Sequence, residues 1–139
     1  MRKAISLFLA LVVALTLLAS CGGSNPSKVN EAELKKLPEN YPLEAAPLYG
    51  MTEIVSVTNK GSDSYFSYEI IFNSTQKYEN VVDYYSKFFS NVITNDFGIA
   101  YSILYIPQSG GYMCNLSIYS SVTKGTNGES TVQITVSEY

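Results

Sequence analysis

One segment of helical periodicity, residues 73–92, lies in a chain whose other patterned segments alternate with the two-residue period of strands. Apolar residues at spacings of three and four form one stripe on it: Tyr78, Val81, Val82, Tyr85, Phe88, Phe89 and Val92. On the opposite side, Asp83 and Lys87 are spaced for an exposed ion pair. Three polar residues can cap its start: Asn73, Ser74 and Thr75. Because one helix covers only one face of a sheet, we expect the other face to be open to water or to a partner.

The strand-like segments set the rest of the fold. They are residues 53–57, 65–73, 99–106, 112–120 and 130–138. In the second of these, one parity is apolar, whereas Tyr65, Ser67 and Glu69 lie on the other. The order ββαβββ predicts an α+β domain with a five-stranded antiparallel sheet and one amphipathic helix packed on one face. Whether 99–106 or 130–138 pairs beside 65–73 stays open.

The first twenty residues have the layout of a secretory signal. Arg2 and Lys3 precede an apolar stretch, residues 4–19, that is interrupted only by Ser6 and Thr16. Its 16 residues are short for a membrane span, which needs about 20. A retained transmembrane anchor is the alternative interpretation.

The sequence Leu18-Ala19-Ser20-Cys21 follows this stretch and resembles the lipobox of bacterial lipoprotein signal peptides. The resemblance implies cleavage between Ser20 and Cys21 and a diacylglyceryl group on the Cys21 sulfur. Two or three acyl chains, such as palmitate, hold a protein stably on a membrane. The protein is therefore expected to be extracytoplasmic and lipid-anchored to the cell membrane. Cys114 then has no disulfide partner, and its strand parity predicts a small buried hydrophobic residue.

The chain is expected to have three parts, of which the last two form the mature protein. Residues 1–20 form the lipoprotein signal peptide, residues 21–47 a tether and proline-rich lead, and residues 48–139 a single α+β domain. A short helix is expected at the end of the tether, with Asn30 as N-cap and Glu33 closing a capping box. Without Arg2 and Lys3 the chain carries seven basic and twelve acidic residues, a net charge of −5. This charge argues against nucleic acid as a partner.

Two stretches resemble a group of small uncharacterised Firmicute lipoproteins. These have a proline-rich lead that ends in Pro-(Ile/Leu)-Tyr and, after a hairpin, a helix that carries a Tyr-Tyr pair. The matching positions are Pro38, Pro42, Pro47, Leu48 and Tyr49, then Ser74, Val81, Val82, Tyr84 and Tyr85. The resemblance spans roughly residues 38–92. It implies fold and location, and it carries over no catalytic residue.

The composition argues against most catalytic sites. With no histidine, the chain cannot form a Ser-His-Asp or Cys-His arrangement or an imidazole metal site, and it has no phosphate-binding glycine motif. A carboxylate hydrolase is the alternative, with Glu69 as the one acid well inside a strand. An exposed structural role for Glu69 is the simpler interpretation. We therefore expect no enzyme activity, no catalytic residue, no metal and no cofactor.

Tyrosine is the enriched residue, with twelve in the chain, and it suits contact surfaces for proteins and sugars. Four residues fall on the parity opposite the presumed core and form the candidate binding face: Tyr65, Glu69, Tyr119 and Gln133. The simpler interpretation is that tyrosine favours half-buried strands. Two functions follow. The first is a non-enzymatic interaction module that docks another protein of the cell envelope through the uncovered sheet face or an edge strand. The alternative is a small-ligand or glycan binder that uses the tyrosine-bearing face, with Tyr65, Glu69 and Tyr119 flanking a groove.

Overall fold

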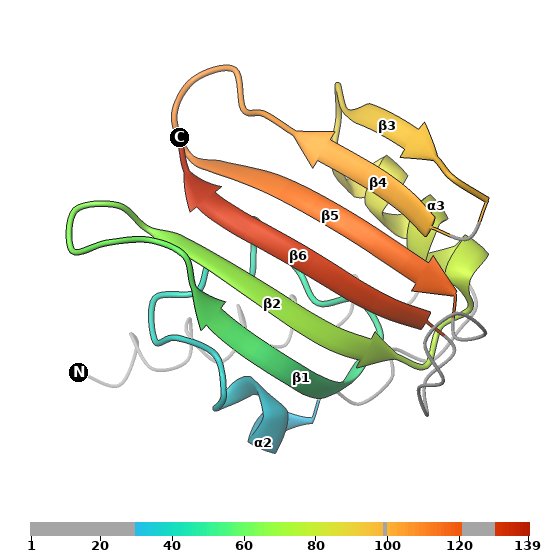
Figure 1. The fold of residues 1–139 in the computed structure, drawn as a ribbon, viewed down its shortest axis with the longest axis horizontal. Coiled ribbons are helices and arrows are strands. Elements are labelled where there is room, and N and C mark those ends of the chain that lie inside the picture. The colour runs from blue at the N-terminus through green and yellow to red at the C-terminus, as the bar shows by residue number, and fades with distance from the viewer. Residues whose placement is uncertain (1–29, 99, 121–129) are drawn as a thin grey trace, which may run out of the picture.

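A computed structural model describes residues 30–98, 100–120 and 130–139. It shows an α+β fold built on an open, fully antiparallel sheet, as expected (Figure 1). The elements in chain order are α2 (Glu31–Leu34), β1 (Met51–Asn59), β2 (Ser67–Ser74), α3 (Tyr78–Phe88), β3 (Ile93–Asp96), β4 (Ala100–Tyr105), β5 (Tyr112–Ser120) and β6 (Ser130–Glu138).

Within the described part of the chain the sheet has six strands, so the expectation of five is wrong. Its order is β1-β2-β6-β5-β4-β3, and β6 therefore pairs beside β2. The additional strand is β3, a four-residue edge strand whose residues are all exposed. A strand without a buried face carries no apolar alternation, which is why the sequence pattern did not reveal it.

The helix α3 is shorter than the periodic segment, 73–92, that predicted it. Its N-cap is Lys77, which makes no side-chain capping hydrogen bond, so capping by Asn73, Ser74 or Thr75 is also wrong. Ser74 stays in β2 because it pairs with Ser130, and its hydroxyl donates to Tyr49 O at 3.1 Å. The expected ion pair is confirmed, with Lys87 Nζ 2.7 Å from the Asp83 carboxylate.

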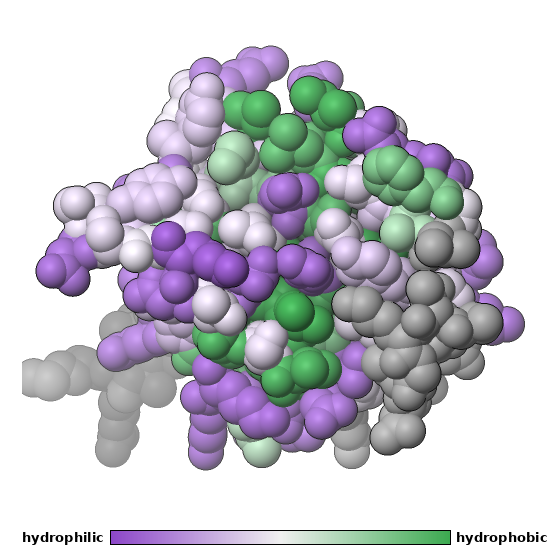
Figure 2. Space-filling view, in the orientation of Figure 1, coloured by the Kyte–Doolittle hydropathy of each residue, from purple (hydrophilic) through white to green (hydrophobic). Residues whose placement is uncertain are grey.

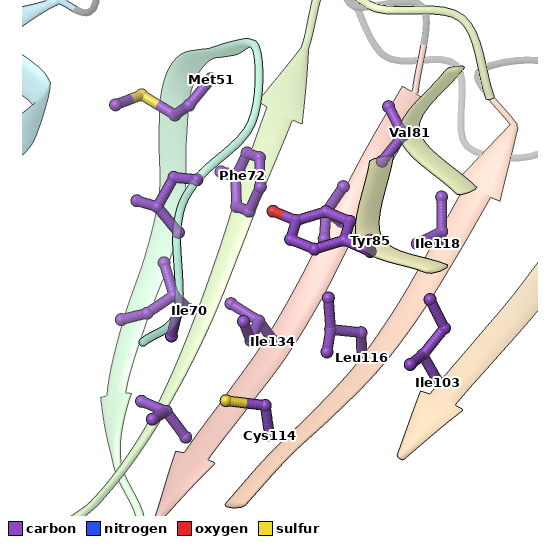
Figure 3. Close-up of a cluster of buried hydrophobic side chains, with 14 of the residues drawn as sticks. Met51, Ile70, Phe72, Val81, Tyr85, Ile103, Cys114, Leu116, Ile118 and Ile134 are labelled. Carbon is purple, nitrogen blue, oxygen red and sulfur yellow. The ribbon is translucent and has the colours of Figure 1, made fainter. Parts of the chain in front are cut away.

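The core lies between α3 and one face of the sheet. Figure 3 shows Val81 and Tyr85 on α3 directed towards apolar side chains of β5 and β6. Among the described residues, twelve apolar side chains are fully buried: Ala46, Ile70, Phe72, Val81, Tyr85, Ile103, Cys114, Leu116, Ile118, Val132, Ile134 and Val136. Cys114 is thus a buried hydrophobic residue, as its strand parity predicted. In the part of the chain that the structure describes, no helix lies on the opposite face of the sheet (Figure 1).

The proline-rich lead also contributes to the core. Tyr41, Ala46 and Leu48 are buried, and the Tyr41 hydroxyl donates to Ala46 O at 3.1 Å. Burial raises the pKa of Tyr41 far above its usual range. The lead therefore packs as part of the folded unit and brings the chain to β1.

The short helix α2 lies beside β1, at one edge of the sheet (Figure 1). Asn30 is its N-cap, as predicted, and its side chain accepts from Ala32 N at 3.2 Å. Glu33 was expected to close a capping box, but its carboxylate accepts instead from Ile54 N in β1 at 2.7 Å. The tertiary contact thus takes the place of the local one. No helix among the residues described here is long and apolar enough to cross a membrane.

Candidate functional site

The uncovered face of the sheet brings two of the four expected binding residues together. Gln133 Nε2 on β6 donates to Glu69 Oε2 on β2 at 2.8 Å, and Lys60 Nζ lies 3.6 Å from the other carboxylate oxygen. Glu69 is therefore held by an amide and an ammonium group. These contacts support the structural interpretation of this acid.

The two tyrosines of that prediction lie far from each other. Tyr65 lies in the β1–β2 hairpin, two residues before β2 begins, and it is 46% exposed. Tyr119 is level with Thr131 and Asn73, at the other end of the sheet. Asn73 lies six positions after Ser67 along β2, about 20 Å at the usual strand rise. The prediction that Tyr65 and Tyr119 flank one groove with Glu69 is therefore wrong.

A band of polar side chains crosses the middle of this face, and its members are hydrogen bonded to one another. Ser67 and Ser137 pair at 2.8 Å across β2 and β6, and Thr131 donates to Asn73 at 3.2 Å. All four of these residues are buried. Because these side chains are buried and bonded to one another, they present little polar surface to a ligand.

Apolar side chains lie on either side of the polar band. Figure 2 shows a hydrophobic patch over β3 and β4 and a second one over β1 and β2. By strand parity the first patch contains Ile93, Leu104 and Met113, and Ile106 follows the end of β4 with the same parity as Leu104. We call these four residues the β4 patch. Ile93 is 59% exposed and Ile106 39%. An exposed apolar patch on a sheet is typical of a protein contact surface.

The residues that resemble the Firmicute lipoproteins converge at one point on the other side of the molecule. The Tyr85 hydroxyl donates to Pro47 O at 2.6 Å and accepts from Tyr49 N at 3.2 Å. The Tyr84 ring stacks on the Tyr49 ring, with centroids 3.9 Å apart and planes inclined by 5°. Burial is the main cause that raises the pKa values of both Tyr84 and Tyr85. We call Pro47, Tyr49, Ser74, Tyr84 and Tyr85 the lead clasp, because they fix the lead to α3 and β2.

The lead clasp forms one wall of an open groove of about 550 Å³ along α3. Its lining consists of Tyr49, Gln76, Asn80, Asp83, Tyr84, Lys87 and Phe88. Aromatic rings and amide side chains together suit a sugar-like ligand, which has both apolar faces and hydroxyl groups. Sequence reasoning missed this groove, since Tyr49 and Tyr84 are 35 residues apart; their shared place in the resemblance was the one available signal.

Cys114, the one cysteine among the described residues, is suited to packing rather than to nucleophilic chemistry. Its thiol is fully buried and lies 3.8 Å from Ala45 O. Burial raises the pKa of Cys114 to about 12, so the thiolate is not formed at neutral pH. The described part of the chain also contains no group of three or more acidic or cysteine side chains that could hold a metal ion.

The expected lipid attachment and cleavage residues, Ser20 and Cys21, lie outside the described residues. Comparison of the chain with protein-family models, with curated proteins and with solved structures finds no match.

Proposed function

We propose that this chain is an extracytoplasmic lipoprotein, held on the cell membrane by a lipid on Cys21, whose domain docks another protein of the cell envelope without catalysis. The lipobox at residues 18–21 and the resemblance to small Firmicute lipoproteins support the anchoring half of the proposal. The uncovered sheet face supports the docking half.

The β4 patch is the observation that carries the docking proposal. On this face the polar band is paired internally, and Ile93 and Ile106 expose much of their apolar surface. Burial of such surface against a partner is favourable by about 25 cal/mol per Å² before the costs of association. A surface with paired polar groups and exposed apolar ones fits a protein better than a hydrophilic ligand.

The position of the patch relative to the anchor fits this role. The tether from Cys21 reaches the domain at Asn30, next to α2 and the β1 edge. The strands β1 and β3 lie at opposite edges of the sheet, five strand spacings apart, which is about 24 Å. The β4 patch therefore lies on the side of the sheet that is remote from the tether and accessible to a neighbouring protein.

Affinity capture from solubilised membranes tests the docking proposal. Full-length tagged protein is expected to recover one stoichiometric partner, and Leu104→Lys is expected to lose it, because a charge in the patch opposes burial. The matched control is Phe88→Lys, at a 41% exposed aromatic on the helix side, which is expected to retain the partner. Capture that is equal for both variants would contradict docking through the β4 patch.

Binding of a small ligand or glycan is the second candidate, and the groove along α3 favours it over the sheet face. Asn80 and Asp83 lie there beside the stacked rings of Tyr49 and Tyr84. A glycan array is the test, with Asn80→Ala as the variant. Glycan binding that Asn80→Ala abolishes and Leu104→Lys preserves would favour this candidate over docking.

A further inference from the structure

The two edges of the sheet are treated differently. At the β1 edge, α2 and the turn that follows it contact both outward backbone groups of Ile54: Glu33 Oε2 accepts from Ile54 N at 2.7 Å, and Lys36 Nζ donates to Ile54 O at 3.4 Å. The same two side chains pair with each other at 2.7 Å. Side-chain contacts of this kind prevent a foreign strand from adding to an edge. The β1 edge is therefore protected at Ile54.

The β3 edge has no corresponding helix among the described residues, and β4 is the one strand there that pairs with it. Phe97 N donates to Ala100 O at 2.9 Å, which fixes the alternation of hydrogen bonds along the hairpin. By that alternation Asn95 and Ile93 bond to β4, whereas the N–H and C=O groups of Thr94 and Asp96 point outward. The side chains at this edge are exposed, up to 59% for Ile93 and 67% for Phe97.

We propose that β3 pairs antiparallel with β3 of a second copy of this chain, with Thr94 of each copy opposite Asp96 of the other. The observation behind this choice is that the edge is complementary to itself. The register places both outward residues of one strand opposite both outward residues of the other. Four backbone hydrogen bonds then form around a twofold axis at Asn95.

The side chains match in this register. Ile93, Asn95 and Phe97 share the uncovered face by alternation, so Ile93 of one copy meets Phe97 of the other at both ends of the pairing. These are two of the most exposed apolar side chains of the domain. The two Asn95 amides meet at the axis, and on the helix side each Thr94 hydroxyl lies opposite an Asp96 carboxylate.

The neighbouring registers are less favourable. Pairing Asp96 with its own copy brings two carboxylates directly opposite each other, which is destabilising. Pairing Thr94 with Thr94 of the other copy separates Ile93 from Phe97. It also moves each Asp96 away from its position opposite Thr94. Charge and apolar contact thus both select the register that is centred on Asn95.

This inference deepens the proposed function and rests on it. A four-residue strand gives only a small interface, so the pairing depends on the lipid anchor, which holds two copies on one membrane surface. Anchoring raises their effective concentration without any new contact. Pairing of β3 also continues the β4 patch of one copy into that of the other, since Ile93 belongs to the patch.

Disulfide trapping in the full-length, membrane-inserted protein tests the register directly. A pair that is not hydrogen bonded at the twofold axis has Cα atoms about 4.5 Å apart, within the range for a disulfide. Asn95→Cys is expected to give at least tenfold more covalent dimer under mild oxidation than Thr58→Cys, the matched control at an exposed position on β1. Thr94→Cys and Asp96→Cys report on the two rejected registers and are expected to give less dimer than Asn95→Cys.

A second variant separates pairing from chance collision. Phe97→Asp, added to Asn95→Cys, is expected to reduce the dimer yield to the Thr58→Cys level, because it removes the apolar contact with Ile93 at both ends of the pairing. Phe97 is 67% exposed, so the substitution should leave the fold intact. An Asn95→Cys yield equal to that of Thr58→Cys, or one that survives Phe97→Asp, overturns the self-pairing. If the self-pairing is overturned but Leu104→Lys still abolishes partner capture, the proposed function stands. If the Asn95→Cys dimer and the Leu104-dependent partner capture are both absent, both proposals are refuted.

Discussion

Removal of one hydroxyl from the lead clasp should destabilise the whole domain. In Tyr85→Phe the ring and its packing remain, but Pro47 O loses its donor at 2.6 Å and Tyr49 N loses its acceptor at 3.2 Å. Each net hydrogen bond contributes about 0.5–1.5 kcal/mol, and a buried backbone group left without a partner costs about 1–3 kcal/mol. Because Tyr85 is fully buried, water cannot easily replace its hydroxyl. The expected loss is about 2–3 kcal/mol in the free energy of unfolding.

Urea denaturation of the mature chain, followed by circular dichroism, measures this loss. The midpoint should fall while the m-value stays constant, since the surface exposed on unfolding is unchanged. At roughly 4–8 °C per kcal/mol for a domain of about this size, Tm should fall by about 10–20 °C. The lead should also become accessible to protease before the sheet does, because the lead clasp holds it.

Tyr78→Phe is the matched control, since it removes a hydroxyl from the same helix. The Tyr78 hydroxyl is buried and has no hydrogen-bond partner among the described residues. Its removal should leave stability unchanged or raise it by up to about 1 kcal/mol, because an unpaired buried hydroxyl is itself unfavourable. Equal effects of Tyr85→Phe and Tyr78→Phe would refute the role assigned to the lead clasp.

Three further predictions concern other parts of the fold. Burial raises the pKa of Cys114 from an ordinary 9.0 to about 12. The stability that the buried neutral thiol contributes is therefore complete below pH 9 and is lost as the pH rises towards 12. At pH 8 the thiol should react with a disulfide reagent only after unfolding. The hydrogen bond from Lys36, followed by that from Ile54 N, lowers the pKa of Glu33. The stability that the ionised carboxylate contributes is therefore present above pH 4.5 and lost in acid. Glu33→Gln should lower the free energy of unfolding at pH 7 and reduce its fall below pH 4.5, which urea titrations at neutral and acidic pH would measure. Gly50 has φ +65° and a Cβ there would lie 2.5 Å from a side-chain oxygen of β2, so Gly50→Ala should destabilise by about 1–3 kcal/mol, and an unchanged Tm would contradict this.

Local periodicity was sufficient for the elements that have one buried and one open side. The alternation in 112–120 and 130–138 predicted β5 and β6 and the burial of Cys114, and the stripe on 73–92 predicted α3. It failed at β3, where all four residues are exposed and no alternation exists. It also failed at the start of α3, where Ser74 is a good capping residue but is held in β2 by its contacts with Tyr49 and Ser130.

The candidate site was predictable only as far as strand parity reaches. Parity placed Glu69 and Gln133 on one face, and the structure joins them at 2.8 Å. It could not give the distance along the strands between Tyr65 and Tyr119, because that depends on sheet order and register. The lead clasp was beyond reach for a related reason: the Tyr85 hydroxyl bonds to a residue 38 positions earlier, and no local pattern encodes such a contact.

Metabolic labelling with a fatty-acid probe tests most directly whether this protein is anchored through Cys21. The wild-type chain and Cys114→Ala are expected to take up label and to sediment with membranes, because the Cys114 thiol is buried in the folded domain. Cys21→Ser is expected to lose both the label and the membrane association. Label on Cys21→Ser at the wild-type level, or its loss from Cys114→Ala alone, would contradict the proposed anchor.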